Sequence, residues 1–482
     1  MISGSYDVVV IGGGPAGMAA ATTAATGQSS VLLIDAAQSP GGSYFKPPPI
    51  DFDIKLSRHD AKIADALRER VTRLNQQQVD LLPETQVWGI FQGRETTFNS
   101  RTADNPAPLT LYLDPTGIVE ARTLIIATGV YDRPIPFPGW TLPGIMTPGA
   151  AQMLIKKQGL LPGKRVIVAG TGPLQTVVAA TLADAGADVV ALLDPCAATD
   201  GASQIPNAMW GQWDKMWEFT RHLVSLIRNH VPMQFRHTIF RAIGTPQTGI
   251  QKAIIGRVDA DGYPITGTEE SLDVDLICAA YGFMPSIAVT LHLGCTHEFN
   301  SNLGAYIPSH NECTQTSLDG VFVAGDITGV GGKSLAELQG QIAGISALEN
   351  LGVFTNKEAE VMRAKLHPAI ARENRFVNWL WKRWRIKSGF WSMIDDDTTV
   401  CHCEMVMAAA VRQSCANGAR NLFGMKMRTR LGMGICQGRY CATNAAFLMA
   451  QELDCSVKEI GLPSIRPPIV PVRLRTMAAK NS

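Results

Sequence analysis

Short apolar runs that end in glycine or aspartate recur along the chain and predict buried strands. The first run, Tyr6 to Ile11, is followed by the small-residue segment "AGMAAATTAATG", which predicts a helix. A second apolar run, Ser30 to Ile34, predicts the next strand. Later runs lead into "ATG", "AGD" and a second glycine turn. Strands that alternate with helices in this way are typical of an α/β fold.

The composition narrows the classes of protein to consider. The chain has 482 residues, of which 46% are hydrophobic and 18% charged, so it can bury a large core in several domains. A net charge of +1 gives no support for nucleic acid as a partner. The sequence shows neither a secretory leader nor an apolar run of about 18 residues, so we expect a cytoplasmic protein without a membrane span. Thiols stay reduced in the cytoplasm, so clustered cysteines favour metal or redox chemistry.

The first glycine turn predicts a dinucleotide site. Its residues are Gly12, Gly14, Pro15, Ala16 and Gly17. Gly12 permits a tight turn, Gly14 lets a pyrophosphate approach the backbone, and Gly17 allows close contact between helix and strand. The helix that follows offers unpaired N–H groups to the phosphates. Asp35, which ends the second predicted strand, is placed to accept hydrogen bonds from an adenosine ribose.

Two later strand ends carry motifs that resemble those of flavoproteins with two dinucleotide-binding domains. These residues are Ala127, Thr128 and Gly129 in "RTLIIATGVYDRP", and Gly325 and Asp326 in "DGVFVAGDITGVGG". In that family the aspartate of the second motif binds the ribityl or phosphate region, so the resemblance implies FAD at the first site. Residues 39–49, which include Gly42 and Ser43, resemble the family's loop beneath the isoalloxazine ring. A plain surface loop is the alternative.

A second strand–turn–helix–strand unit begins at "GKRVIVAGTGPLQ". It contains Gly170 and Gly172, but Gln175 stands at the third glycine position, and Asp194 closes the next strand. Such a unit normally binds NAD(P)H. A bulky third residue separates helix and strand, and no arginine follows Asp194 to meet a 2′-phosphate. NADH binding, a retained scaffold, and a site for another adenine nucleotide remain open. The unit has no C-x-x-C pair, which excludes thioredoxin-reductase chemistry.

Four cysteines gather near the carboxyl end, first as C-x-C and then, after a longer spacer, as C-x-x-x-x-C. They are Cys401, Cys403, Cys436 and Cys441. The spacer has helical periodicity, broken near Asn417–Gly418 and Gly424, so two helical pieces would bring the pairs together. Thiolates suit zinc or an iron–sulfur cluster, but the cysteines of zinc knuckles normally have a different, short spacing. An iron–sulfur cluster, zinc and unligated thiols are the alternatives.

"CHCE…GMGICQGRYC" resembles the [2Fe–2S] domain of bacterioferritin-associated ferredoxin. It is more similar still to the version fused to the α subunits of heteromeric flavin amine dehydrogenases. These include opine oxidases, L-proline and D-hydroxyproline dehydrogenases, and hydrogen cyanide synthase. The resemblance implies that all four cysteines bind a [2Fe–2S] cluster. It further implies a β subunit related to D-amino-acid oxidases that converts an amine to an imine, an FMN between subunits, and a small third iron–sulfur subunit.

The predicted fold is an α/β, Rossmann-like flavoprotein with an inserted second Rossmann-like domain and a small helical C-terminal [2Fe–2S] domain. The predicted divisions are 1–135 and 289–355 for the FAD domain, 136–288 for the NAD(P)-like insert, 356–395 for a connector, and 396–482 for the cluster domain and tail. The connector segment Glu373 to Trp391 holds four tryptophans among basic residues. A membrane surface, a subunit interface and packing on its own chain are its three interpretations.

The resemblance makes the chain the electron-transfer subunit of an opine or amino-acid oxidase, with no catalytic residue of its own identified. A self-contained NADH-dependent reductase is the alternative. A non-catalytic protein with a zinc module is a third hypothesis.

Overall fold

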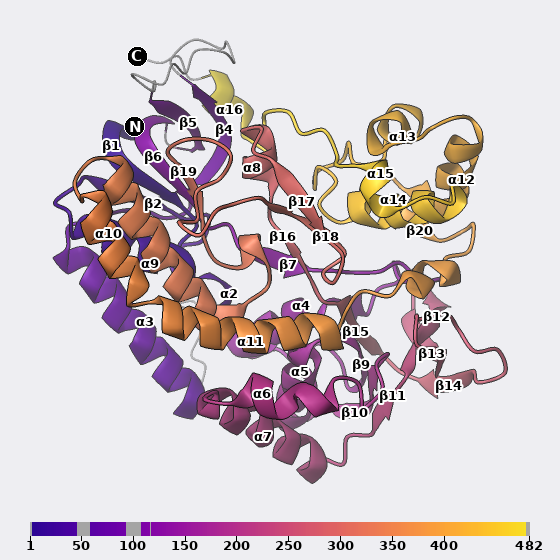
Figure 1. Ribbon diagram of the computed structural model, residues 1–482. Coiled ribbons are helices and arrows are strands. Elements are labelled where there is room, and N and C mark those ends of the chain that lie inside the picture. Colours follow the sequence, from indigo (N-terminus) through magenta and orange to yellow (C-terminus); the bar gives the residue numbers. More distant parts are fainter. Residues whose placement is uncertain (1, 46–57, 93–107, 116, 479–482) are drawn as a thin grey trace.

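The computed structural model describes residues 2–45, 58–92, 108–115 and 117–478 (Figure 1). Residues 46–49 of the predicted flavin loop lie outside the described residues. Two sheets with helices packed on them form most of the molecule, and a small helical domain stands at one side of it (Figure 1). None of the helices in these ranges combines the length and apolarity that a bilayer crossing requires.

The first sheet carries the first glycine turn. Its strand order is β3-β2-β1-β6-β5-β4, with β19 beside the second half of β6. The strands are β1 (Ile2–Ile11), β2 (Val31–Ile34), β3 (Asp80–Leu82), β4 (Gln86–Gln92), β5 (Leu109–Asp114), β6 (Gly117–Ile126) and β19 (Val321–Val323). β1, β2, β3, β6 and β19 run parallel, whereas β4–β5 and β5–β6 are antiparallel pairs. The carboxyl ends of β1, β2, β6 and β19 therefore lie along one edge.

Helices cover this sheet by close packing of small residues. Those of this part are α1 (Pro15–Ala25), α2 (Gly42–Phe45), α3 (Arg58–Gln76), α8 (Ala288–His292), α9 (Gly332–Asn350) and α10 (Asn356–Ala364). A Cβ added at Gly340 of α9 would lie 2.1 Å from the Ala16 carbonyl oxygen of α1, and one at Gly344 would lie 2.8 Å from that of Ala20. The two helices can approach this closely only because the contact residues lack bulk.

The inserted domain has a second, parallel sheet in the order β11-β10-β9-β15-β8. Its strands are β8 (Ile145–Met146), β9 (Arg165–Thr171), β10 (Asp188–Asp194), β11 (Met233–Phe235) and β15 (Leu276–Tyr281). Its helices are α4 (Pro148–Gln158), α5 (Pro173–Asp184), α6 (Ile205–Met209) and α7 (Trp213–Arg228). An antiparallel sheet is attached, formed by β12 (His237–Thr245), β13 (Gly249–Arg257) and β14 (Glu270–Asp273). The two passages between the domains pair with each other as β7 (Val130–Asp132) and β16 (Phe283–Pro285).

The rest of the chain forms a hairpin, a connector helix and the small C-terminal domain. These elements are β17 (His297–Asn300), β18 (Ala305–Pro308), α11 (His367–Arg383), β20 (Thr399–Cys401), β21 (Val406–Met407), α12 (Ala408–Ala416), α13 (Leu422–Thr429), α14 (Cys441–Glu452), α15 (Val457–Ile460) and α16 (Leu474–Ala478). Trp391, fully buried, stacks on Phe447 of α14 at 3.8 Å and so anchors the connector to this domain.

The two helices predicted between the cysteine pairs are confirmed by α12 and α13. The first predicted break is also confirmed, because the C-cap of α12 is Asn417 and Gly418 has a positive φ. The second predicted break is wrong: Gly424 lies inside α13, where its N–H is capped by the Asn421 side chain at 2.8 Å.

Candidate functional site

The first glycine turn leaves no space for side chains. Gly12 has a φ of +104°, and an added Cβ would lie 2.3 Å from the Ala127 carbonyl oxygen. A Cβ added at Gly17 would lie 1.8 Å from the Gly12 carbonyl oxygen. The turn from β1 into α1 therefore depends on glycine for steric reasons, as the sequence pattern predicts.

The N-terminus of α1 is open to an anion. Gly14 is its N-cap and no side chain caps the helix, so its first N–H groups, beginning at Ala16 after Pro15, have no side-chain acceptor. Gly42, with a φ of +58°, lies against this turn, because a Cβ added there would be 2.8 Å from the Gly14 Cα. Ser43 follows it in α2. Two backbone segments without side chains thus meet where a pyrophosphate would bind.

Asp35 follows β2 directly and is held by backbone hydrogen bonds. The Gly13 N–H donates to its Oδ2 at 2.6 Å, and the Ala37 N–H donates to its Oδ1 at 2.7 Å. A carboxylate has about four lone-pair positions, so each oxygen keeps one for another donor such as a ribose hydroxyl.

The two later motifs lie at the ends of β6 and β19, on the same edge of the sheet. The Ala127 N–H donates to the Ile11 carbonyl at 2.8 Å, which places Ala127, Thr128 and Gly129 beside the glycine turn. A Cβ added at Gly325 would lie 2.7 Å from the Ala16 Cβ, in the first turn of α1.

Asp326 follows Gly325 and caps the next helix. The N–H groups of Gly331 and Gly332 donate to its Oδ1 at 3.0 Å, and burial raises the pKa of its carboxyl. The structure therefore gathers the sequence-predicted dinucleotide residues at the carboxyl edge of one sheet.

The second glycine turn differs in both of its ligand-facing positions. Gln175 is buried and folds back, so that its Nε2 donates to the Ala280 carbonyl at 2.7 Å. The Gln175 side chain therefore occupies the space that a glycine at this position would leave between helix and strand. Asp194, at the end of β10, accepts hydrogen bonds from the Cys196 N–H at 2.8 Å and from Trp384 Nε1 at 3.1 Å. Burial raises the pKa of its carboxyl.

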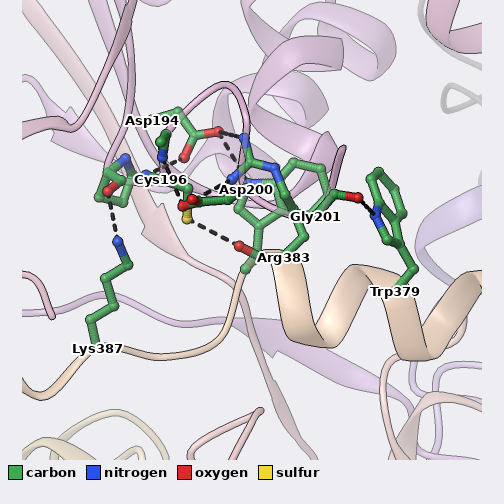
Figure 2. A network of polar contacts seen from close by, with 10 residues as sticks. Asp194, Cys196, Asp200, Gly201, Trp379, Arg383 and Lys387 are labelled. Carbon is green, nitrogen blue, oxygen red and sulfur yellow. Dashed lines mark hydrogen bonds and ion pairs between the residues drawn. The ribbon is translucent and has the colours of Figure 1, made fainter. Parts of the chain in front are cut away.

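Figure 2 shows side chains of the connector gathered around Asp194 and the residues that follow it. Arg383, at the end of α11, approaches Asp194 at 3.4 Å, and Lys387 Nζ donates to the Pro195 carbonyl at 2.8 Å. Trp379 Nε1 donates to the Gly201 carbonyl at 3.0 Å. The carboxylate that would bind a nicotinamide-dinucleotide ribose is thus already paired within the chain.

All four connector tryptophans have indole N–H partners in the same chain. These are Gly201 for Trp379, Val330 for Trp381, Asp194 for Trp384 and Asn444 for Trp391. Packing on its own chain, one of the three predicted interpretations, therefore accounts for this segment.

The four C-terminal cysteines meet. Cys401 ends β20 and Cys441 begins α14, and both are buried, whereas Cys436 is half-buried and Cys403 is exposed. Cys441 influences the pKa of both Cys401 and Cys436, and Cys436 influences that of Cys403, so the four side chains are near neighbours. β20, α12, α13 and the loop before α14 thus bring the two cysteine pairs together, although a long spacer separates them in sequence.

The surroundings of these sulfurs favour thiolates. The neighbouring Cys441 thiol, as a hydrogen-bond partner of either sulfur, lowers the pKa of Cys401 to about 6 and that of Cys436 to about 5. Backbone N–H groups add to the effect, from Gly432 at Cys401 and from Gly438 at Cys436. Hydrogen bonds to both neighbours raise the pKa of Cys441, and burial raises that of Cys403. The thiolate is the form in which cysteine acts as a nucleophile or metal ligand.

The four cysteines together supply a set of soft thiol ligands. Among the described residues, no three His, Cys, Asp or Glu side chains are arranged so that they could hold a single metal ion. A mononuclear zinc site needs four converging ligands. A [2Fe–2S] cluster is bound by four cysteines, two on each of its irons. Four thiols brought together thus match the ligand number and type of the two-iron centre.

The cysteine loop touches the strand that follows the first dinucleotide site. Tyr131 of β7 donates its hydroxyl to the Arg439 carbonyl at 2.8 Å, and its ring packs edge-on against Tyr440 at 5.3 Å. A cavity lined by apolar side chains lies beside this contact. Its lining includes Tyr131, Ser286, Phe299, Gln437, Arg439 and Ala446.

Three residues near these contacts are not singled out by any sequence pattern. Tyr131 and Arg439 stand inside the quoted motifs but carry no signal of their own. Arg133 is a fully buried guanidinium whose Nε and Nη1 have no partner among the described residues. Burial lowers the pKa of Arg133 to about 10. An aromatic or a basic residue beside a motif is too common to identify such side chains from sequence.

Comparison with known proteins agrees with this geometry. Residues 6–347 match the family described as pyridine nucleotide-disulphide oxidoreductase. This chain belongs to that family. Residues 396–481 match a second family, the sarcosine oxidase A3 domain. The first match indicates FAD at the first site, where the glycine turn and the uncapped helix fit its pyrophosphate.

Relatives and solved structures sharpen the placement within this flavoprotein family. The opine oxidase A-type subunit of Rhizobium meliloti is 30% identical over 83% of this chain and 73% of its own length. The hydrogen cyanide synthase subunit HcnB of Pseudomonas protegens is 29% identical over 73% of this chain and 74% of its own length. The L-proline dehydrogenase of P. horikoshii has the same fold, with a TM-score of 0.68 at 20% identity over 99% of this chain and 80% of its own. The chain is thus a flavoprotein oxidoreductase of the opine oxidase type.

Proposed function

We propose that this chain is the electron-transfer subunit of a heteromeric flavoenzyme that oxidises an opine or an amino acid. A partner subunit of the D-amino-acid-oxidase kind removes two electrons and two protons from the amine, and the imine is hydrolysed by water. The present chain takes the electrons at FAD and passes them singly to a [2Fe–2S] centre.

The observation that carries the proposal is the contact between the flavin domain and the cysteine loop. Tyr131 lies two residues after Gly129 of the flavin motif and hydrogen-bonds Arg439 of the loop. Cys436 lies close enough to Tyr131 to influence its pKa, which burial is the main factor in raising. The flavin motif and the cysteine loop are therefore neighbours in space, although they are far apart in sequence.

Each part of the chain has a task in such a relay. The glycine turn and the α1 N-terminus would hold the FAD pyrophosphate, and Asp35 and Asp326 would accept hydrogen bonds from hydroxyl groups of the ribose and ribityl chain. Backbone N–H groups around Cys401 and Cys436 offset the negative charge of bound thiolates. When bound, FAD supplies two-electron acceptance and the cluster supplies one-electron transfer.

The relatives support a multi-subunit assembly, since those compared are named as subunits of opine oxidase and hydrogen cyanide synthase. The inserted domain has no C-x-x-C pair, so the disulfide reduction that gives the family its name has no redox pair to use there. If an amine is the electron source, the flavin domain needs no C-x-x-C pair beside it.

The test is anaerobic reduction of the chain by a panel of opines and amino acids, with and without its co-purified partner. We expect flavin bleaching followed by cluster reduction only when the partner is present. Amine-dependent dye reduction by the chain alone would place the catalytic site here and contradict the proposal. A flavin that is reduced while the cluster stays oxidised would contradict the relay.

The self-contained NADH-dependent reductase receives no support from the second glycine turn. Gln175 fills the third glycine position, and Asp194 is paired with the connector. Stopped-flow mixing with NADH separates the two functions, because an NADH-dependent reductase would bleach its flavin rapidly.

A further inference from the structure

The loop and helices that surround the cysteines carry a strong local charge. Residues 401–441 contain six Lys or Arg and a single acidic residue, Glu404, while the whole chain has a net charge of only +1. This segment is therefore more positive than the molecule as a whole, and the remainder of the chain is net negative.

Part of that charge has no partner. Arg412 pairs with Asp396 and Glu452, and Arg430 pairs with Glu404 at 2.8 Å. The other four cations form no ion pair within 4.0 Å among the described residues. They are Arg420, Lys426, Arg428 and Arg439. Unpaired surface charge of one sign attracts a partner of the opposite sign and raises its association rate.

Apolar side chains are exposed in the same region. Met405 follows Cys403 by two residues and is 57% exposed, and Ile435 precedes Cys436 directly and is 71% exposed. Met427, between the unpaired cations Lys426 and Arg428 of α13, is 64% exposed. Exposed methionine and other apolar groups beside unpaired charge are features of protein interaction surfaces.

The flavin domain contacts the cysteine loop at a different residue from these exposed side chains. Cys403 is exposed, whereas Tyr131 contacts the cysteine loop on the buried side through Arg439. α13 packs on α12 and α14 at the outer edge of the C-terminal domain (Figure 1). The contact at Arg439 therefore leaves these exposed side chains open to a second protein.

We propose that the surface formed by Met405, Lys426, Met427, Arg428 and Ile435 docks an acidic one-electron carrier protein. The inference rests on the proposed electron-transfer function. One electron passes from the reduced [2Fe–2S] centre to the oxidised carrier, with no bond made or broken and no proton moved. Two such one-electron transfers pass on the two electrons that one amine oxidation releases. Transient redox partners of this kind bury little area and rely on charge for orientation.

The charges could instead only tune the potential of the cluster, so the test separates the two roles. The charge-reversal variant K426E/R428E is compared with K357E/K365E, which makes the same change in net charge at α10. Lys357 and Lys365 are exposed, and α10 lies on the opposite side of the molecule in Figure 1. The probes are an acidic plant-type ferredoxin and a basic cytochrome c.

Binding of both probes is measured by interferometry at low and high salt, and the cluster midpoint potential is measured for each variant. We expect the ferredoxin to bind the wild-type chain with a salt-dependent Kd and to prefer it over cytochrome c. K426E/R428E should weaken this binding about tenfold with the potential unchanged, and K357E/K365E should leave it intact. Equal ferredoxin binding by both variants, preference for cytochrome c, or a shift in potential without loss of binding would each overturn the proposal.

The binding measurement does not depend on turnover. Iron and sulfide content and thermal stability are recorded for every variant, so a misfolded domain is recognised before binding is compared. A chain that binds the ferredoxin but is not reduced through its partner would retain the docking surface and contradict the proposed function. A chain that is reduced through its partner but binds no acidic carrier would retain the proposed function and contradict the docking surface.

Discussion

Replacing Tyr131 with phenylalanine tests the contact between the flavin domain and the cysteine loop. The substitution removes only the hydroxyl, which donates to the Arg439 carbonyl at 2.8 Å. Burial raises the pKa of Tyr131, so the phenol stays protonated and remains a donor throughout the usable pH range. The ring keeps its edge-on packing against Tyr440, so no cavity is created.

The expected loss follows from the hydrogen bond alone. A neutral hydrogen bond contributes about 1 kcal/mol, and a buried carbonyl left without a donor costs about 1–3 kcal/mol. Because the loop is partly exposed and water can reach some of it, we expect about 1–2 kcal/mol of local destabilisation. That change corresponds to a roughly 5–30-fold increase in the population of the opened loop.

Amide hydrogen exchange at Arg439, Tyr440 and Cys441 measures this opening directly. Tyr131→Phe should accelerate exchange in the loop and slow electron transfer from flavin to cluster, with global stability little changed. Tyr263→Phe is the matched control, because the Tyr263 side chain is exposed in the inserted domain. Unchanged loop exchange and an unchanged transfer rate in Tyr131→Phe would show that this contact does not couple the two sites.

Three further outcomes follow from the same contacts. Cys441→Ser should lose visible iron–sulfur absorbance and bound iron, because it removes the thiol that neighbours both Cys401 and Cys436. The control Cys415→Ser, whose side chain is buried in α12, should retain both. Equal iron content in the two variants would contradict the ligand assignment. Gly17→Ala should yield protein without flavin, measured by heat release, because its Cβ would lie 1.8 Å from the Gly12 carbonyl oxygen; full flavin content would contradict the site. Mixing the native chain with NADH should leave the flavin spectrum unchanged over seconds, and rapid bleaching would show that the second glycine turn is functional.

Local spacing made much of the fold and of both candidate sites predictable. The glycine turn at Gly12 and Gly17 is required by contacts within one strand–turn–helix unit, so its signal lies within a few residues of sequence. The two cysteine pairs are likewise short patterns. The helices between them are predictable from periodicity. Gly424 alone is misleading: it suggests a break, but it lies in the first turn of α13, where its N–H donates to the Asn421 side chain.

Contacts between distant segments could not be predicted in this way. Asp194 looks like a ribose ligand from its position after a strand, but its partner Trp384 lies 190 residues further along the chain. Tyr131 and Arg439 are separated by 308 residues. Nothing in either local pattern specifies such a pairing, because it depends on how complete domains pack together. The partner chain and the identity of the amine stay predictions for the same reason.

The most direct test of the relay is the metal content of the native chain. Iron, zinc and acid-labile sulfide are quantified together with the electron paramagnetic resonance spectrum after dithionite reduction. We expect about two irons and two sulfides per chain, and a signal from a one-electron-reduced [2Fe–2S] centre. A colourless protein that carries about one zinc ion and no sulfide would contradict it.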